Sequence, residues 1–433
     1  MNLNKKIYFV IASVAITMGA YAQSGTNSPY SQYGLGLMSD QTSGFNRGMN
    51  GLGLGFREHN QVNFINPASY SAVDSLTFIF DVGFSGQIVN FKEGSRKLNA
   101  KNADFEYAVG AFRLAKNFGL SFGILPYTTV GYNYASTGKV ANQLSTSYSN
   151  SYYGEGGIHQ VYVGLGYQIV SGLSVGANVS YLWGDYTRMV TNSYSDSYAK
   201  TIQKVYTASV TNYKLDFGIQ YLMNLNKSNS LTLGVVYSPG HKLGANPSCK
   251  IISSNPSTSV SDTVSYSVKN GLEIPTTVGA GLTWNNGGKL KLGFDYNFQK
   301  WDGIPFPVYR VVNQTPIYSL VNDYYMNRHK VTLGGNYCGD ETSRTFLKRL
   351  NFRAGVSYAT PYYKINGNDG PSELSVSAGF GIPIVNSYNN KSVLNISGQW
   401  VHSSAKHFIA ENTFRINLGL TFNERWFMKW KVE

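Results

Sequence analysis

The chain has 433 residues and a formal net charge of +13; it is 14% charged and 14% aromatic, with 46 Gly and 33 Tyr. Its basic residues are spread along the chain and not gathered in one patch, which argues against a nucleic-acid partner. No stretch beyond the N-terminus is long and apolar enough for a transmembrane helix, so a membrane would be crossed by strands.

Residues 1–22 have the pattern of a secretory signal peptide. Lys5 and Lys6 precede an apolar run, and residues 20–22 (Ala-Tyr-Ala) form an A-x-A cleavage site. The alternative, a membrane anchor, needs about 20 apolar residues, which is more than this run provides. We therefore expect an exported protein whose mature chain begins at Gln23.

Residues 23–75 differ in composition from the C-terminal remainder of the chain. Four closely spaced glycines and the tripeptide Asn66-Pro67-Ala68 weaken both helix and strand formation. The segment also lacks the alternation of a strand. We predict a compact N-terminal plug (hatch) at 23–75, enclosed by a domain that spans 76–433.

Alternation of apolar and polar residues with period two dominates the chain from residue 76 to its end. A mean hydropathy of −0.21 is compatible with a membrane barrel, since only every second residue of a strand meets lipid. Fourteen strands are predicted, at 76–88, 104–114, 118–134, 158–169, 173–189, 207–222, 230–242, 273–284, 289–301, 324–338, 348–364, 372–383, 392–403 and 411–427. The fold class is thus all-β, a transmembrane antiparallel β-barrel.

The connections support this interpretation because short and long ones alternate. Links such as 115–117 and 171–172 are tight, whereas 135–157, 185–206, 243–272 and 302–323 are predicted as long polar loops. Short periplasmic turns and long extracellular loops are typical of outer-membrane barrels. An exported soluble sandwich, the alternative, gives no reason for this sorting.

Charged residues fall on the predicted inward face of the strands. A charge facing lipid at mid-depth costs about 2–4 kcal/mol, so inward placement is required if the barrel forms. The predicted lumenal charges are Asp81, Glu106, Lys214, Asp216, Lys291, Asp295, Lys330, Arg353 and Arg415.

The Gly-rich segment that ends in Asn-Pro-Ala before the first of fourteen strands resembles the FadL/OmpP1/TodX family of outer-membrane transporters. Similar stretches are 274–282 (IPTTVGAGL) and 350–356 (LNFRAGV), and the resemblance covers nearly the whole mature chain. It implies passive uptake of long-chain fatty acids or aromatic hydrocarbons, with plug rearrangement and lateral exit through the wall. The implied partners are a hydrophobic small molecule and outer-membrane lipid, and a monomer is expected.

The resemblance carries over to three sets of residues. Asn66, Pro67 and Ala68 are the implied hatch residues, and Leu125, Pro126 and Tyr127 form the candidate kink in the third strand beside a lateral opening. A proline there removes a ladder donor, but it is also compatible with a strand end that has no transport role. The candidate ligand contacts are Phe56, Phe64, Ile65 and Tyr70, which equally suit packing of the plug.

A second function stays open: a FadL-like barrel that binds, shuttles or assembles proteins, as in type IX secretion. A continuous apolar tunnel ending beside Pro126 favours transport, whereas a sealed wall with a protein-sized outer groove favours protein binding. Two G-x-S-x-G matches, at 119–123 and 172–176, lie at the start of predicted strands, whereas the nucleophile elbow of an esterase needs a strand-to-helix turn, so we expect no enzyme. No cluster of Cys, His and acidic residues suggests a metal site, and no cofactor is expected. Cys249 and Cys338 fall on opposite rims and are predicted not to be bonded.

Overall fold

The computed structural model describes residues 25–141, 143–340, 343–385 and 391–424. The signal peptide predicted at 1–22 lies outside the described residues. So do residues 425–433, which contain the end of the predicted last strand.

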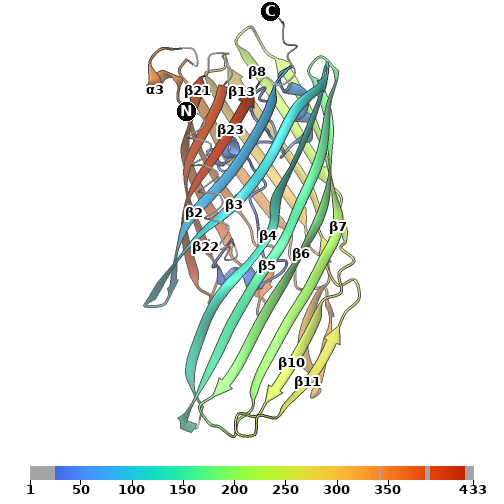
Figure 1. Ribbon diagram of the computed structural model, residues 1–433, viewed down its shortest axis with the longest axis vertical. Coiled ribbons are helices and arrows are strands. Elements are labelled where there is room, and N and C mark those ends of the chain that lie inside the picture. The colour runs from blue at the N-terminus through green and yellow to red at the C-terminus, as the bar shows by residue number, and fades with distance from the viewer. Residues whose placement is uncertain (1–24, 142, 341–342, 386–390, 425–433) are drawn as a thin grey trace, which may run out of the picture.

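Fourteen antiparallel strands form a closed ring (Figure 1), which confirms the predicted fold class. Each strand pairs with the next in the chain, and β23 pairs with β2 to close the ring. The strands are β2 (Phe78–Glu93), β3 (Arg96–Ala115), β4 (Phe118–Val140), β5 (Gln143–Val170), β6 (Leu173–Tyr194), β7 (Thr201–Asn224), β8 (Asn229–Ser238), β13 (Thr276–Asn286), β14 (Leu290–Lys300), β17 (Arg328–Cys338), β18 (Asn351–Ala359), β21 (Ser372–Val385), β22 (Lys391–Ser404) and β23 (Ala410–Glu424).

An apolar band surrounds the ring, as the alternation predicts. Phe217 and Ile219 of β7 are exposed on the outside, whereas Gln220 is fully buried on the inside. The same sorting recurs in β14, where Leu292 faces outward and Asp295 is buried. Apolar side chains on the outer face and polar ones inside are the pattern of a transmembrane barrel, and the protein is a β-barrel of the outer membrane.

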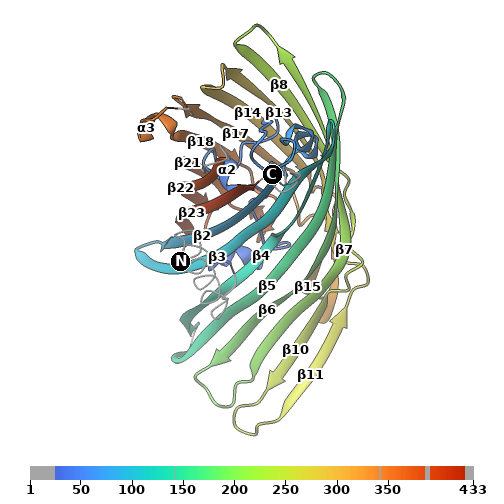
Figure 2. The same ribbon diagram turned by 45° about the horizontal axis from the view of Figure 1, so that its top comes forward.

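All four segments predicted as long loops contain strand, and three of them, 135–157, 185–206 and 302–323, are mostly strand. β5 is 28 residues long and β7 is 24, far more than the roughly 9–11 residues that cross a bilayer. The added stretches are rich in Ser, Thr, Tyr and Asn. β10 (Ser248–Ser254) pairs with β7, and β11 (Ser261–Ser267) pairs with β10. Together with the ends of β4, β5, β6 and β7 they form a six-stranded sheet beyond one side of the ring (Figures 1 and 2). We call this the projecting sheet.

Short elements occupy the interior and the loops. Other strand boundaries also differ from the prediction: β2 continues to Glu93, β3 begins at Arg96, β8 ends at Ser238, β17 begins at Arg328 and β18 ends at Ala359. A short helix precedes β18, so this strand begins only at Asn351. The short elements are η2 (Pro29–Gln32), β1 (Leu37–Met38), α2 (Gly44–Arg47), η3 (Pro67–Ala72), β9 (His241–Lys242), β12 (Glu273–Ile274), β15 (Phe306–Val312), β16 (Thr315–Val321), α3 (Phe346–Arg349), β19 (Lys364–Ile365) and β20 (Asn368–Asp369).

The two cysteines test the predicted topology. Cys249 lies in β10 of the projecting sheet, and Cys338 is the last residue of β17, at the other end of the barrel. Both are buried, and no disulfide joins them. The prediction that they are not bonded is confirmed.

Candidate functional site

Residues 25–75, which we call the inner segment, lie inside the ring (Figure 2). The wall makes room for it with inward glycines, where a side chain would collide with the inner segment's backbone or side chains. A Cβ at Gly218 would lie 2.1 Å from Asn66 Oδ1, and one at Gly176 would lie 2.4 Å from the carbonyl carbon of Pro67. Similar close approaches occur at Gly119, Gly166, Gly234 and Gly355. The abundance of glycine in the wall therefore has a steric cause.

Asn66, Pro67 and Ala68, predicted as hatch residues, begin the short helix η3 against the wall. Asn66 caps this helix, because its side chain accepts from Ala68 N at 3.2 Å, and Pro67 supplies a preset φ at the first position. Asn66 Nδ2 also donates to Leu54 O at 3.0 Å and to Ile219 O of β7 at 3.2 Å. One buried amide thus joins two parts of the inner segment to the wall.

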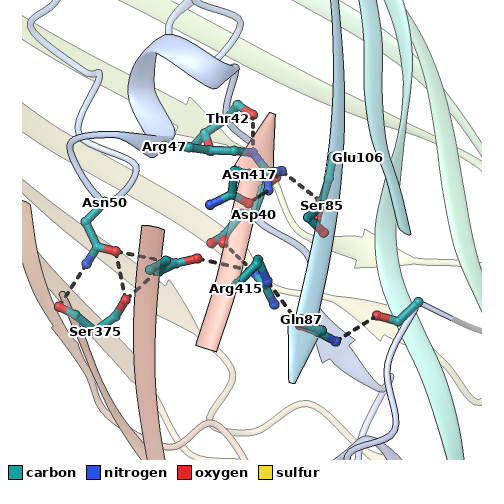
Figure 3. A network of polar contacts seen from close by, with 12 residues as sticks. Asp40, Thr42, Arg47, Asn50, Ser85, Gln87, Glu106, Ser375, Arg415 and Asn417 are labelled. Carbon is teal, nitrogen blue, oxygen red and sulfur yellow. Dashed lines mark hydrogen bonds and ion pairs between the residues drawn. The ribbon is translucent and has the colours of Figure 1, made fainter. Parts of the chain in front are cut away.

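A buried ion pair holds the helix α2 to β3 (Figure 3). Arg47 Nη2 lies 2.8 Å from Glu106 Oε2, and Arg47 Nε donates to Thr42 O at 3.1 Å. Glu106 Oε1 accepts from Ser85 Oγ of β2 at 2.5 Å. The pair is charge-assisted at both partners, so it fixes the position of α2 as well as neutralising a lumenal carboxylate.

Asp40 forms the second charged contact with the wall. Its carboxylate lies 3.3 Å from Arg415 Nη1 and 3.9 Å from Lys330 Nζ. Burial would raise the pKa of Asp40, but Lys330, Arg415 and Arg47 together lower it to about 2. Asp40 is therefore ionised at neutral pH and balances two of the predicted lumenal cations.

The remaining predicted lumenal charges also point inward, and most of them contact the inner segment. Asp295 Oδ2 accepts from the backbone N–H groups of Gly53 and Leu54 at 2.7 and 2.9 Å. Lys291 pairs with Glu58 at 2.5 Å, and the guanidinium of Arg353 lies 4.5 Å from the ring centre of Phe45. Asp81 accepts from Tyr107 Oη at 3.0 Å, and Tyr107 Oη also accepts from Gly44 N. Lys214 and Asp216 pair with each other.

β3 and β4 are unpaired over their extracellular halves. The sequence analysis expected an opening beside Leu125, Pro126 and Tyr127, but not the loss of pairing along these two strands. Their pairing runs only from Ala115 and Phe118 to Ala108 and Ile124. Beyond this point β3 pairs with β2 alone, while β4 pairs with β5 and, at two residues, with β1 of the inner segment. We call the space between residues 96–107 and 125–140 the seam.

The inner segment fills part of this seam. Leu37 and Met38 pair with Thr129 and Thr128 of β4, and Ser31 Oγ bonds the backbone N–H and C=O of Gly131. On the other side, Asn27 Nδ2 donates to Lys101 O of β3 at 3.2 Å. The inner segment therefore bonds to both borders of the seam.

The candidate kink lies at the start of the seam. The register between β4 and β5 shifts between Pro126 and Thr128, so the chain bulges where a ladder donor is missing. Pro126 O accepts from Gln41 Nε2 at 2.7 Å, and Tyr127 O accepts from Ser39 N at 3.1 Å. Leu125 and Tyr127 are buried.

The four candidate ligand contacts divide into two pairs. Phe56 and Tyr70 are buried and pack the inner segment on itself and on the wall. Phe64 and Ile65 line a cavity of about 250 Å³ beside Tyr127 and Gln160. Six charged residues also line this cavity: Asp40, Lys214, Asp216, Arg328, Lys330 and Glu373.

Aromatic side chains close the extracellular end of the ring. Trp301 is fully buried and its ring centre lies 4.9 Å from that of Tyr325 and 4.7 Å from that of Tyr362. Tyr362 Oη donates to Gly36 O, and Tyr363 Oη donates to Tyr30 O at 3.1 Å, so the loops bond directly to the inner segment. Sequence reasoning did not identify these residues as a cluster, because they come from separate loops that only the fold brings together.

Metal sites and membrane-spanning helices are both absent from the described ranges. No group of three or more His, Cys, Asp or Glu residues there is placed to hold a metal ion. The helices of these ranges are too short or too polar to cross a membrane.

Comparisons with known proteins separate family from fold. The family model that matches the chain is that of BamG, over residues 3–433. No curated protein matches the chain.

Solved structures share the fold at low sequence identity. The CymD monoaromatic hydrocarbon channel is 15% identical with a TM-score of 0.58, over 90% of this chain and 98% of that one. The Pseudomonas putida toluene transporter TodX is 14% identical with a TM-score of 0.61, over 90% and 100%. A Pseudomonas aeruginosa FadL homologue is 12% identical with a TM-score of 0.58, over 89% and 99%. The resemblance to FadL and TodX is thus confirmed as a likeness of fold, and the matching family is a distinct one.

Proposed function

The chain belongs to the BamG family, and we propose that it is a protein-binding, assembly component of the outer membrane built on a FadL-like barrel. The observation that carries this proposal is the projecting sheet. A channel needs strands only as long as the membrane is thick, whereas β4, β5, β6 and β7 continue beyond it and β10 and β11 widen the sheet there.

The two faces of the projecting sheet differ in chemistry. One row of cross-strand neighbours on the outer face is Thr187, Thr207, Ser248 and Ser267. The next row, on the concave face, is Arg188, Tyr206, Cys249 and Tyr266. Partners in register share a face, so these two rows place Ser and Thr on the outer side and two Tyr residues on the concave side.

Part of the concave face is covered and part is accessible. The hairpin of β15 and β16 packs on it through Tyr318, which contacts Tyr206, and Tyr309, which contacts Tyr266. Over β4 to β6 the concave face carries Tyr134, Tyr148, Tyr152 and Tyr194, and we call these four residues the tyrosine face. Tyr134 and Tyr152 stack at 4.7 Å, and Tyr194 is 44% exposed. Tyrosine is enriched in protein-binding surfaces because it offers a large contact area and a polar tip.

The closed interior also supports this proposal. The inner segment is bonded around the lumen, aromatic side chains close the extracellular end, and the cavity of about 250 Å³ is lined with charges. A lumen that is filled by the inner segment and lined with charges suits a rigid scaffold, whereas an apolar cargo would need an open apolar path.

The experiment compares variants of opposite faces of one strand. The tagged chain is extracted from its own outer membrane in mild detergent and the mass of the extracted particle is measured. Tyr148→Ser with Tyr194→Ser should release the partner, whereas Tyr153→Ser, on the outer face of β5, should retain it. Depletion of the chain should lower the amounts of other outer-membrane proteins. A wild-type particle with the mass of one chain, together with unchanged levels of those proteins, would contradict the proposal.

A second function, passive uptake of hydrophobic small molecules with movement of the inner segment and lateral exit, is favoured by the seam beside Pro126. Each methylene moved from water into lipid gains about 0.8 kcal/mol, so a wall opening into the bilayer suits such cargo. Transport on this route requires β1 to leave β4.

A reversible lock on the seam tests uptake. Met38 and Thr128 are cross-strand partners, which places their Cα atoms about 4.5–5.5 Å apart, within reach of a disulfide. In the pair Met38→Cys with Thr128→Cys, uptake of radiolabelled fatty acid or toluene should stop under oxidation and return on reduction. The single variants serve as controls. Equal uptake by cells with and without the chain would exclude this function.

A further inference from the structure

A hollow of about 510 Å³ lies on the outer face of β5, β6 and β7. We call this surface the hollow. Its rim is formed by Val161, Tyr181, Trp183, Asp185, Ser209 and Thr211. The floor is formed where β6 carries Gly184 with a φ of +148°, and a Cβ there would lie 2.1 Å from Gly157 O. Only glycine fits this position, so the depression is built into the backbone.

The hollow stands at the membrane boundary. Below it on the outer face are Val163, Val179 and Phe217, which are exposed to lipid. Above it the same face carries Thr187 and Thr207 of the projecting sheet. Tyr181 and Trp183 thus belong to the aromatic belt that barrels place at the level of the lipid headgroups. Whatever occupies the hollow therefore meets it at headgroup level in the outer leaflet.

Two kinds of side chain face each other across the hollow. Tyr181 and Trp183 present nearly parallel rings, with centres 6.0 Å apart and an interplanar angle of 17°. Trp183 has Thr211 as its cross-strand partner, and Asp185 has Ser209. A flat aromatic surface therefore adjoins one carboxylate and two hydroxyl groups.

We propose that the hollow binds the saccharide headgroup of a glycolipid in the outer leaflet. The sugar ring stacks its apolar face on Trp183 and Tyr181, while its hydroxyl groups donate to Asp185 and bond Ser209 and Thr211. Val161 continues the surface toward lipid, where an acyl chain follows. The site does not depend on the protein-binding function.

The chemistry of the rim separates this ligand from the other headgroups. None of the eight lining residues is Lys or Arg, and Asp185 would repel a phosphate. An ammonium group would suit an aromatic ring beside a carboxylate, but it has no use for the two hydroxyl groups. Several hydrogen-bonding groups beside an aromatic plane match a polyol.

The test uses the purified full chain in phosphatidylcholine nanodiscs. Each preparation contains an equal mole fraction of monoglucosyl diacylglycerol, phosphatidylglycerol or phosphatidylethanolamine, and native mass spectrometry counts the lipids retained. The wild-type chain should retain the glucosyl lipid about two- to tenfold over the other two, the range expected for an aromatic contact. Trp183→Ala and Asp185→Ala should abolish this preference.

Trp400 offers a matched control. It lies on the outer face of β22 and stacks with His402 at 6.1 Å, much as Trp183 lies near His159 at 5.8 Å. Its cross-strand partners are the apolar Val376 and Phe414, so it lacks the hydroxyl groups of the hollow. Trp400→Ala should keep the preference for the glucosyl lipid.

The isosteric variant Thr211→Val controls for misfolding. It should weaken retention of the glucosyl lipid, while its heat-modifiable migration in gels, which reports a folded barrel, stays unchanged. Equal retention of the three lipids by the wild-type chain would overturn the proposal. So would a preference for phosphatidylglycerol or phosphatidylethanolamine, or an equal loss in Trp400→Ala and Trp183→Ala.

Discussion

Arg47 of the inner segment and Glu106 of β3 form an ion pair of 2.8 Å in which both side chains are almost fully buried. Arg47 donates in addition to Asp40 O at 3.2 Å, and Glu106 accepts from Ser85. Each charge offsets the desolvation of the other, so neither is stable in this place alone. The contact thereby makes the fold of the inner segment depend on the wall.

Removing one partner of this pair should destabilise the inner segment. In Glu106→Ala the guanidinium of Arg47 stays buried without its carboxylate, which costs about 3–5 kcal/mol. The cost should appear as a lower denaturant midpoint for protease protection of residues 25–75. The double variant Arg47→Met with Glu106→Leu removes both charges and should recover most of the loss. A double variant as unstable as the sum of its singles would show that the two residues are not coupled.

The glycine contacts of the wall predict a steric effect. Gly218→Ala places a Cβ 2.1 Å from Asn66 Oδ1, so Asn66 must move and release Leu54 O and Ile219 O. We expect loss of about 1–3 kcal/mol, because the buried amide of Asn66 loses its two acceptors. Ion conductance in planar bilayers should rise as the inner segment loosens.

Gly398→Ala is the control for this substitution. Gly398 also lies in a wall strand, but a Cβ there would meet no atom within 4 Å. Its conductance should equal that of the wild type. Equal effects at both positions would refute the steric explanation.

The ring could be predicted from the sequence because lipid imposes a local rule. A strand in a membrane must alternate, so Phe217, Ile219 and Gln220 reveal their faces without knowledge of their neighbours. The same rule placed Lys214 and Asp295 inside. Every lumenal charge predicted in this way faces the interior.

The length of the seam and the projecting sheet could not be predicted, for the opposite reason. Beyond the membrane no face must be apolar, so Ser151 and Thr191 alternate with tyrosines in a pattern that reads equally as loop. The partner of Glu106 is 59 residues distant, and nothing local selects Arg47 over another cation. β1 pairs with β4 where β3 and β4 separate, and its two residues carry no strand signal.

Asp40 predicts a pH dependence of stability. Its pKa lies near 2 in the folded protein, below its ordinary value of 3.8, because Lys330 and Arg415 outweigh the effect of burial. A lowered carboxyl pKa contributes stability above the unfolded pKa, and the contribution is lost as pH falls from about 4 through 2. At neutral pH it amounts to at most about 2 kcal/mol.

The measurement compares wild type with Asp40→Asn by denaturant unfolding of the inner segment at several pH values. The difference in unfolding free energy should be constant from pH 7 to 5 and should shrink toward zero near pH 2. The exposed Asp262 of β11 provides a control, because Asp262→Asn should give no such change. A difference that is the same at pH 2 and pH 7 would contradict the assignment.

The boundary of the membrane on β5 gives the last prediction. Leu165 and Ser151 both point outward from the same strand, Leu165 within the apolar band and Ser151 on the projecting sheet. Arginine facing lipid near the midplane costs about 2–4 kcal/mol, whereas arginine in water beside Thr191 costs close to nothing. Leu165→Arg should therefore lower the free energy of folding into lipid vesicles by that amount, and Ser151→Arg should leave it unchanged. Because the two residues differ only in depth, equal costs would mean that the bilayer covers the projecting sheet, and the tyrosine face would then lie at the wrong height to meet a partner from outside the cell.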